Sequence, residues 1–126
     1  MPHRRQELGH QGEAAALRYL ADKGYKIICQ NWHAGRYGEI DIVALQAGEV
    51  VIVEVKTRQQ IKFGYPEGAV NQAKLNKLRL AAQSFMLAHP QLGSRYRVEV
   101  VALLFDDYQR IVDVKHYRNI HFDGKL

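Results

Sequence analysis

Apolar positions recur at helical spacing in two segments of the chain. Over residues 7–23 most residues are good helix formers, and Ala16, Leu17 and Leu20 share one stripe, so a helix is expected that ends at Gly24. A second helix is expected over residues 71–89, before Pro90, with an apolar stripe formed by Leu75, Leu78, Ala82, Phe85 and Met86.

Shorter apolar runs between turn residues predict five strands, at residues 25–32, 39–45, 50–56, 96–105 and 110–117. Ala47 and Gly48 mark a tight turn between the second and third strands, and Asp106 begins the turn between the last two. The order is helix, three strands, helix and two strands. It predicts a single α/β domain over residues 1–126, with a mixed central sheet flanked by helices.

Composition narrows the class of protein. The chain has 126 residues, of which 47% are hydrophobic and 25% charged, and its one cysteine, Cys29, leaves no partner for a disulfide. No apolar run approaches the roughly 18 residues of a membrane span, and the first residues do not read as a signal peptide. A soluble cytoplasmic domain without a membrane partner is therefore expected.

The positive charge is concentrated in one stretch. Between Lys56 and Arg79 there are six cations and one acid, Glu67, so this stretch accounts for the whole formal charge of +5. This basic stretch could bind an anionic partner such as a nucleic acid. The alternative is that its charges only form a solvated surface.

The central hairpin brings acids together. If Ala47 and Gly48 form a two-residue loop, Asp41 faces Glu54 and Glu39 faces Lys56, and alternation puts all four charges on one side of the sheet. Two opposed carboxylates in a strand that is apolar on both faces are costly, so stability alone would not select them.

A divalent cation would offset the repulsion between the two carboxylates and the cost of burying them. Mg²⁺ or Mn²⁺ takes carboxylate oxygens and keeps waters, and Lys56 would point toward the metal and its attacking water. The alternative is structural: Glu39 and Lys56 form a cross-strand ion pair, while Asp41 and Glu54 lie at exposed strand ends. Both interpretations fit the spacing.

Glu13 lies on the apolar face of the first helix, because Ala16, Leu17 and Leu20 follow it at helical spacing. That face should meet the sheet, so Glu13 could reach the acidic cluster. An acid that interacts with the positive end of the helix dipole is an equally good explanation of Glu13 alone.

Asp41 followed, after a turn, by Glu54-Val55-Lys56 resembles the motif of the PD-(D/E)xK nuclease superfamily. The wider runs GEAAALRYL, NWHAGRYGEIDIVA, VVIVEVKTR and FGYPEGAV resemble the YraN family of predicted endonucleases, which is similar in its core to archaeal Holliday junction resolvases. At Ile40 the proline of the superfamily name is absent.

The resemblance implies a restriction-endonuclease-like fold with a catalytic centre at the hairpin. It implies metal ligands at Asp41, Glu54 and the Val55 carbonyl, a catalytic Lys56 and a supporting acid at Glu13. Because the similar resolvases act on two strands, a homodimer is a further expectation.

Basic and polar residues around the hairpin are candidate nucleic-acid contacts. They are Arg36, Arg58, Lys62, Gln72, Lys74 and Arg79. The alternative for those at the edge of the second helix is that they cover apolar surface with their stems. The expected function is Mg²⁺- or Mn²⁺-dependent endonucleolytic cleavage of DNA, at structured or branched sites rather than at a read sequence, with branched or single-stranded DNA as the expected partner. A non-catalytic nucleic-acid-binding module is the rival.

Overall fold

The computed structural model describes residues 2–59, 72–118 and 120, with side chains from residue 9 onward. Seven main elements follow one another, together with two short 3-10 helices, η1 (Gly35–Tyr37) and η4 (Pro90–Leu92). The main elements are α1 (Pro2–Asp22), β1 (Lys26–His33), β2 (Glu39–Gln46), β3 (Glu49–Arg58), α2 (Gln72–Ala88), β4 (Tyr96–Phe105) and β5 (Ile111–Tyr117).

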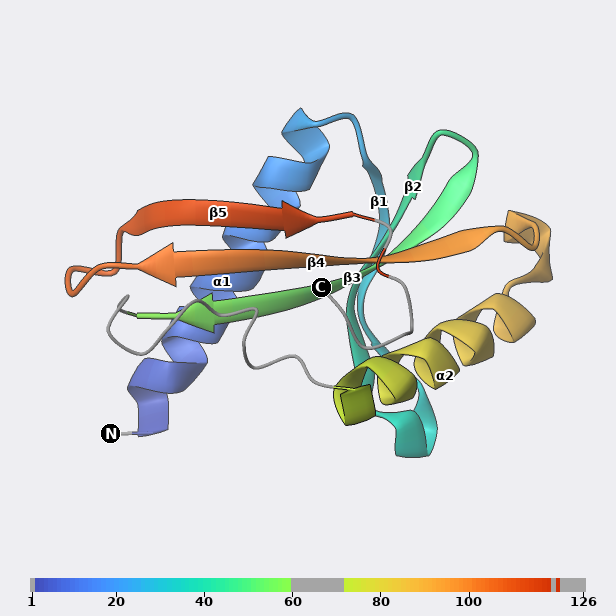
Figure 1. Cartoon of the computed structure of the whole chain (residues 1–126), viewed down its shortest axis with the longest axis horizontal. Helices are drawn as coiled ribbons and strands as arrows, with labels where there is room; N and C mark the ends of the chain where they lie inside the picture. The colour runs from blue at the N-terminus through green and yellow to red at the C-terminus, as the bar shows by residue number, and fades with distance from the viewer. Residues whose placement is uncertain (1, 60–71, 119, 121–126) are drawn as a thin grey trace.

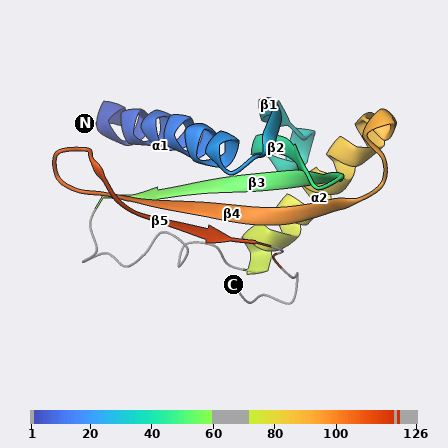
Figure 2. The same cartoon turned by 90° about the horizontal axis from the view of Figure 1, so that it is seen from above.

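The five strands form one mixed sheet in the order β1-β2-β3-β4-β5. Neighbours are antiparallel except β3 and β4, which run parallel and are connected through α2. Figures 1 and 2 show α1 against one face of the sheet and α2 against the other. The prediction of an α/β domain with a mixed sheet flanked by helices is confirmed in these terms.

The hairpin between β2 and β3 has the predicted register. Gln46 pairs with Glu49, and the ladder continues to Ile42 with Val53. Ala47 and Gly48 have φ angles of 53° and 78°, and two positive φ angles are what a tight hairpin turn of this length requires. β3 continues to Arg58, two residues beyond its predicted end, because its parallel pairing with β4 persists to that residue.

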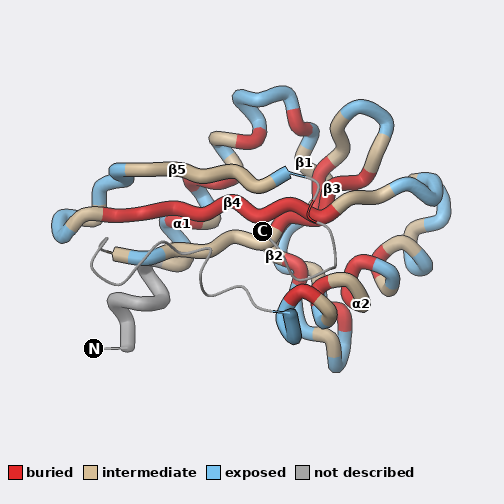
Figure 3. The backbone as a smooth tube through the Cα atoms, viewed as in Figure 1, coloured by how far each residue is buried: buried red, intermediate tan, exposed pale blue. Residues whose placement is uncertain are grey.

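Two apolar layers hold the helices to the sheet. On one face, α2 buries Leu75, Leu78 and Phe85 against a cluster that includes Ile52 and Val100. On the other face, α1 packs against residues of β2, β3 and β4, and the buried members there include Ala16, Leu20, Val51, Val53 and Val101. β4 is buried along most of its length, as Figure 3 shows, because β3 and β5 flank it.

α1 approaches β3 closely at Gly12. A Cβ atom at this position would overlap Cγ2 of Thr57, so only glycine lets the helix lie so near the strand. By contrast, a Cβ at Gly9 would meet nothing. α1 has 21 residues, but neither it nor any other described helix is long and apolar enough to cross a membrane.

Glu99 of β4 is the one fully buried acid among the described residues. It accepts hydrogen bonds of 2.8 Å each from Tyr25 Oη, Arg97 Nε and His116 Nε2, and Tyr19 Oη lies 3.1 Å from the other ring nitrogen of His116. Burial by itself raises the pKa of Glu99, but the hydrogen bonds from His116, Arg97 and Tyr25 outweigh it and hold the pKa at about 2. This network is an ionised cluster inside the α1 face of the sheet.

Candidate functional site

The candidate carboxylates lie where the β2–β3 hairpin opens. In an antiparallel ladder, hydrogen-bonded pairs alternate with pairs that are not hydrogen-bonded. Moving away from the turn, the next hydrogen-bonded pair beyond Ile42 and Val53 would therefore be Ile40 and Val55. The ladder instead ends at Ile42 and Val53. The Val55 amide donates to Oδ2 of Asp41 over 2.7 Å, so the side chain of Asp41 takes the place of the next backbone acceptor.

Beyond this point the facing pairs differ from the prediction. Glu39 pairs with His33 of β1, and neither Asp41 with Glu54 nor Glu39 with Lys56 belongs to the β2–β3 ladder. Glu39 Oε1 lies 3.1 Å from His33 Nε2, and Lys56 Nζ lies 3.4 Å from Glu54 Oε1. The alternative of a Glu39–Lys56 ion pair is therefore wrong, because β2 diverges from β3 and carries Glu39 toward β1.

Asp41 and Glu54 are nevertheless neighbours. Burial first, and then the charge of Glu54, raise the pKa of Asp41 to about 7, while the Val55 amide and Lys56 oppose the rise. The two carboxyl groups are also hydrogen-bonded to each other. The protonated form of Asp41 is therefore favoured to a much higher pH than for an ordinary aspartate.

The backbone of Val55 faces the same gap. The N–H and C=O groups of an extended residue point to the same side of its strand, and the Val55 N–H points to Asp41. The Val55 carbonyl oxygen is thus directed to the space that β2 leaves. Two carboxylates and this carbonyl make a set of hard oxygen donors.

Glu13 reaches the cluster from α1. Burial and the Asp41 carboxylate raise the pKa of Glu13, and a hydrogen bond with the side chain of Asn31 lowers it. Asn31 has φ of 51°, a left-handed conformation that Asn tolerates better than most residues. Sequence reasoning missed Asn31; the signal available was an Asn inside an apolar strand, opposite the acidic one.

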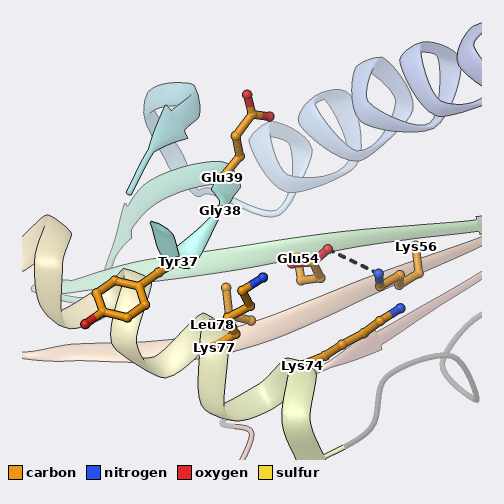
Figure 4. A pocket seen from close by; sticks show the side chains of 8 residues that line it. All are labelled: Tyr37, Gly38, Glu39, Glu54, Lys56, Lys74, Lys77 and Leu78. Atoms are coloured by element: carbon orange, nitrogen blue, oxygen red, sulfur yellow. Dashed lines mark ion pairs between the residues drawn. The ribbon is translucent and has the colours of Figure 1, made fainter. Parts of the chain in front are cut away.

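Glu54 and Lys56 also line an open pocket of about 240 Å³ between the sheet and α2 (Figure 4). From α2, Lys74, Lys77 and Leu78 line its other side. Figure 4 shows the Glu39 carboxylate directed away from Glu54. The remaining lining residues are Tyr37 and Gly38.

The predicted nucleic-acid contacts are only partly gathered here. Of them, Lys74 lines the pocket, and the exposed Arg58 ends β3 two residues after Lys56. Gln72 is exposed at the start of α2 and donates to Asn76, and the half-buried Arg79 lies further along the helix.

Arg36 is exposed in η1, where it donates to the Tyr37 hydroxyl over 3.0 Å and its guanidinium lies over the Tyr37 ring. Lys62 falls outside the described residues. Lys77 was missed by sequence reasoning, although its spacing of three residues from Lys74 places both on one face of a helix.

Within the part of the chain that the structure describes, no three His, Cys, Asp or Glu side chains are close enough to hold a metal on their own. A cation at the hairpin would therefore depend on Asp41, Glu54 and the Val55 carbonyl. Mg²⁺ commonly takes one or two carboxylates and keeps several waters, so this donor set fits it better than zinc.

The family model of an uncharacterised protein family, UPF0102, matches residues 12–103. The chain belongs to the UPF0102 family. The matched segment contains Glu13, Asn31, the whole β2–β3 hairpin and α2. The expected membership in a YraN-type family is thereby confirmed at the level of UPF0102.

Curated UPF0102 proteins from several bacteria match along most of their length. One from Clavibacter michiganensis subsp. michiganensis is 42% identical over 102 residues, which are 81% of this chain and 86% of the relative. Another, from Syntrophomonas wolfei subsp. wolfei, is 43% identical over 101 residues, or 80% and 87% of the two chains. A UPF0102 protein from Desulforamulus reducens is 36% identical over 121 residues, or 94% and 98%.

Proposed function

We propose that this chain is a metal-dependent endonuclease that hydrolyses phosphodiester bonds in DNA, with a restriction-endonuclease-like fold of the PD-(D/E)xK kind. One observation carries the proposal. Where β2 leaves β3, burial and then the neighbouring Glu54 carboxylate raise the pKa of Asp41 to about 7, and Lys56 lies 3.4 Å from Glu54. A carboxyl group with a strongly raised pKa, next to a lysine and an open pocket, is typical of a catalytic site.

Asp41, Glu54 and the Val55 carbonyl would hold Mg²⁺ or Mn²⁺. When bound, the metal supplies a nucleophilic water at neutral pH and charge stabilisation for the phosphoryl oxygens. The proton between Asp41 and Glu54 would leave as the cation binds, because ligands must be deprotonated.

Lys56 would act on the water and on the substrate. Its amino group lies beside Glu54, and Lys56 lines the pocket, which supports a role in orienting the attacking water and in offsetting charge on the phosphate. Glu13 would support the site from α1 as an additional acid near Asp41.

The proposed substrate is DNA at branched or single-stranded sites. Support for an anionic polymer comes from the net charge of +5 and from the cations around the pocket. Action as a homodimer, which would bring two such sites to two strands, and a location in the cytoplasm belong to the same proposal.

A cleavage panel tests the function. Single-stranded, duplex, flap and four-way-junction DNA are incubated with wild type and with Glu54→Gln, in Mg²⁺, in Mn²⁺ and in EDTA; Asp107→Asn, an exposed acid in the β4–β5 turn, is the matched control. We expect metal-dependent cleavage by wild type and the control, none by Glu54→Gln, and similar DNA affinity for all three. Cleavage by Glu54→Gln would refute the site. Binding without cleavage by wild type would favour the rival, a non-catalytic nucleic-acid-binding module.

A further inference from the structure

The charges on α2 are distributed against its dipole. The helix reads QAKLNKLRLAAQSFMLA, with no acid, no cation in its last turn, and its cations Lys74, Lys77 and Arg79 all in the first half. The first turn of a helix carries partial positive charge, so a cation such as Lys74 is disfavoured there and anions are favoured. The helix dipole therefore does not explain this arrangement.

The same half of α2 borders the candidate active site. Lys74 and Lys77 line the pocket together with Lys56 and Glu54, and Figure 4 shows the amino groups of the two helical lysines directed across it toward β3. Glu54 is already paired with Lys56, and Glu39 with His33. The lining of the pocket contains three lysines and two glutamates, so it carries more positive than negative charge.

We propose that Lys74 and Lys77 bind the phosphate next to the scissile phosphate on the cleaved strand. This inference rests on the proposed nuclease function, because Glu54 and Lys56 define which phosphate is scissile. The pocket, at about 240 Å³, is smaller than the sites of drug-sized ligands, so it suits a short piece of sugar-phosphate backbone. Two lysines three residues apart on one helix face attract the single negative charge of a phosphodiester group and can donate hydrogen bonds to its two non-bridging oxygens.

A binding experiment without metal tests the anion site independently of catalysis. Anisotropy of a fluorescein-labelled DNA strand is measured in EDTA over a range of salt concentrations for wild type, Lys74→Ala, Lys77→Ala and the double variant. Lys26→Ala, an exposed lysine of β1, is the control. Each α2 substitution should flatten the log-log salt slope by about 0.7 on single strands and about 0.9 on duplex DNA, and the control should not.

Thermal melting supplies a second readout. If Lys77 serves binding, replacing it by Ala removes a like-charge neighbour of Lys74 three residues away and adds a better helix former. The melting temperature should then rise slightly while DNA affinity falls. A lysine that only stabilises the fold would give the opposite result, with a lower melting temperature and an unchanged salt slope, and would overturn the inference.

Neutral methylphosphonate linkages identify the phosphate itself. Single methylphosphonates are placed in turn beside the cleavage site, and the rate is compared between wild type and the Lys74→Ala, Lys77→Ala double variant. We expect about a tenfold loss for wild type at one adjacent linkage and no further loss for the double variant there. Equal sensitivity of both proteins at every linkage would refute the inference. Glu54→Gln separates the two claims, since its continued cleavage would refute the function itself, whatever the lysines do.

Discussion

The Val55 amide donates a 2.7 Å hydrogen bond to the carboxylate of Asp41, one residue beyond the end of the β2–β3 ladder. This contact fixes the orientation of Asp41 where the two strands separate. It also lowers the pKa of Asp41, yet burial and Glu54 still raise that pKa to about 7. The acid is thus held by the backbone in a place where its negative charge is disfavoured.

Asp41→Asn should stabilise the metal-free protein at neutral and alkaline pH. The usual pKa of Asp41 is 3.8 and its folded value is about 7, so the folded state holds the extra proton and loses stability as pH rises between these values. Above pH 7 we expect the variant to be more stable by about 1 kcal/mol, since solvent near this half-buried acid screens part of the full shift. Near pH 4 the two proteins should melt alike.

Differential scanning fluorimetry in EDTA and in millimolar Mn²⁺ measures both effects. A ligand that binds only the folded state raises its melting temperature, so Mn²⁺ should stabilise wild type and hardly affect Asp41→Asn. The same Mn²⁺ response in both proteins would show that Asp41 is not a ligand.

Gly12→Ala should destabilise the chain although alanine is the better helix former. The new Cβ would overlap Cγ2 of Thr57, and we expect a loss of about 1–3 kcal/mol from this overpacking. Gly9→Ala, in the same helix but facing open space, should gain about 0.5–1 kcal/mol. In a Thr57→Ser background, which lacks the clashing methyl, most of the Gly12→Ala loss should disappear, as chemical denaturation would show.

Asn31→Gly tests the positioning of Glu13. Glycine accepts the φ of 51° but removes the side chain that hydrogen-bonds Glu13, so stability should change little while cleavage falls by about tenfold. Asn31→Ala, which is strained at this φ, should lower both. If Asn31→Gly cleaves at the wild-type rate, Asn31 has only a conformational role.

Glu99→Gln should cost about 3 kcal/mol, because it removes the nearer carboxylate partner of the largely buried Arg97, which keeps only the more exposed Glu49 at 3.3 Å, and breaks a network with His116. The pKa of Glu99 falls from its usual 4.5 to about 2 in the folded protein. Its contribution is therefore complete above pH 4.5 and is lost as pH falls toward 2. Urea denaturation across that window should show this loss in wild type and a flatter profile in the variant.

The helices and strands were predictable because each depends on residues that are close together in the sequence. The turn at Ala47 and Gly48 fixed the register of the hairpin. The apolar stripe of α2 identified four of its five buried residues, but missed Ala81 and included the partly buried Met86. The fold class followed from the order of helices and strands.

The site was predicted less completely, because it depends on where a strand stops following its neighbour. Extending the hairpin register to Glu39 was wrong, since the residues of β2 that precede Ile42 are not paired with β3. No residue pattern marks that point. The left-handed Asn31 and the buried Glu99 network, likewise, are products of tertiary contacts between elements far apart in the sequence.

The single parallel ladder has a consequence for the order of folding. All four ladders join consecutive strands, but β3 and β4 are separated by α2, whereas the other three pairs are joined by short connections. Closing so long a loop is slow, and we expect the docking of β4 on β3 to limit the folding rate, which φ-value analysis at Val51 and Val101 would measure. Asp41 and Glu54 both lie in the hairpin that forms from local contacts, but its apolar environment is completed only when β4 arrives. The acidic pair therefore reaches its native proton affinity only in the last stage of folding.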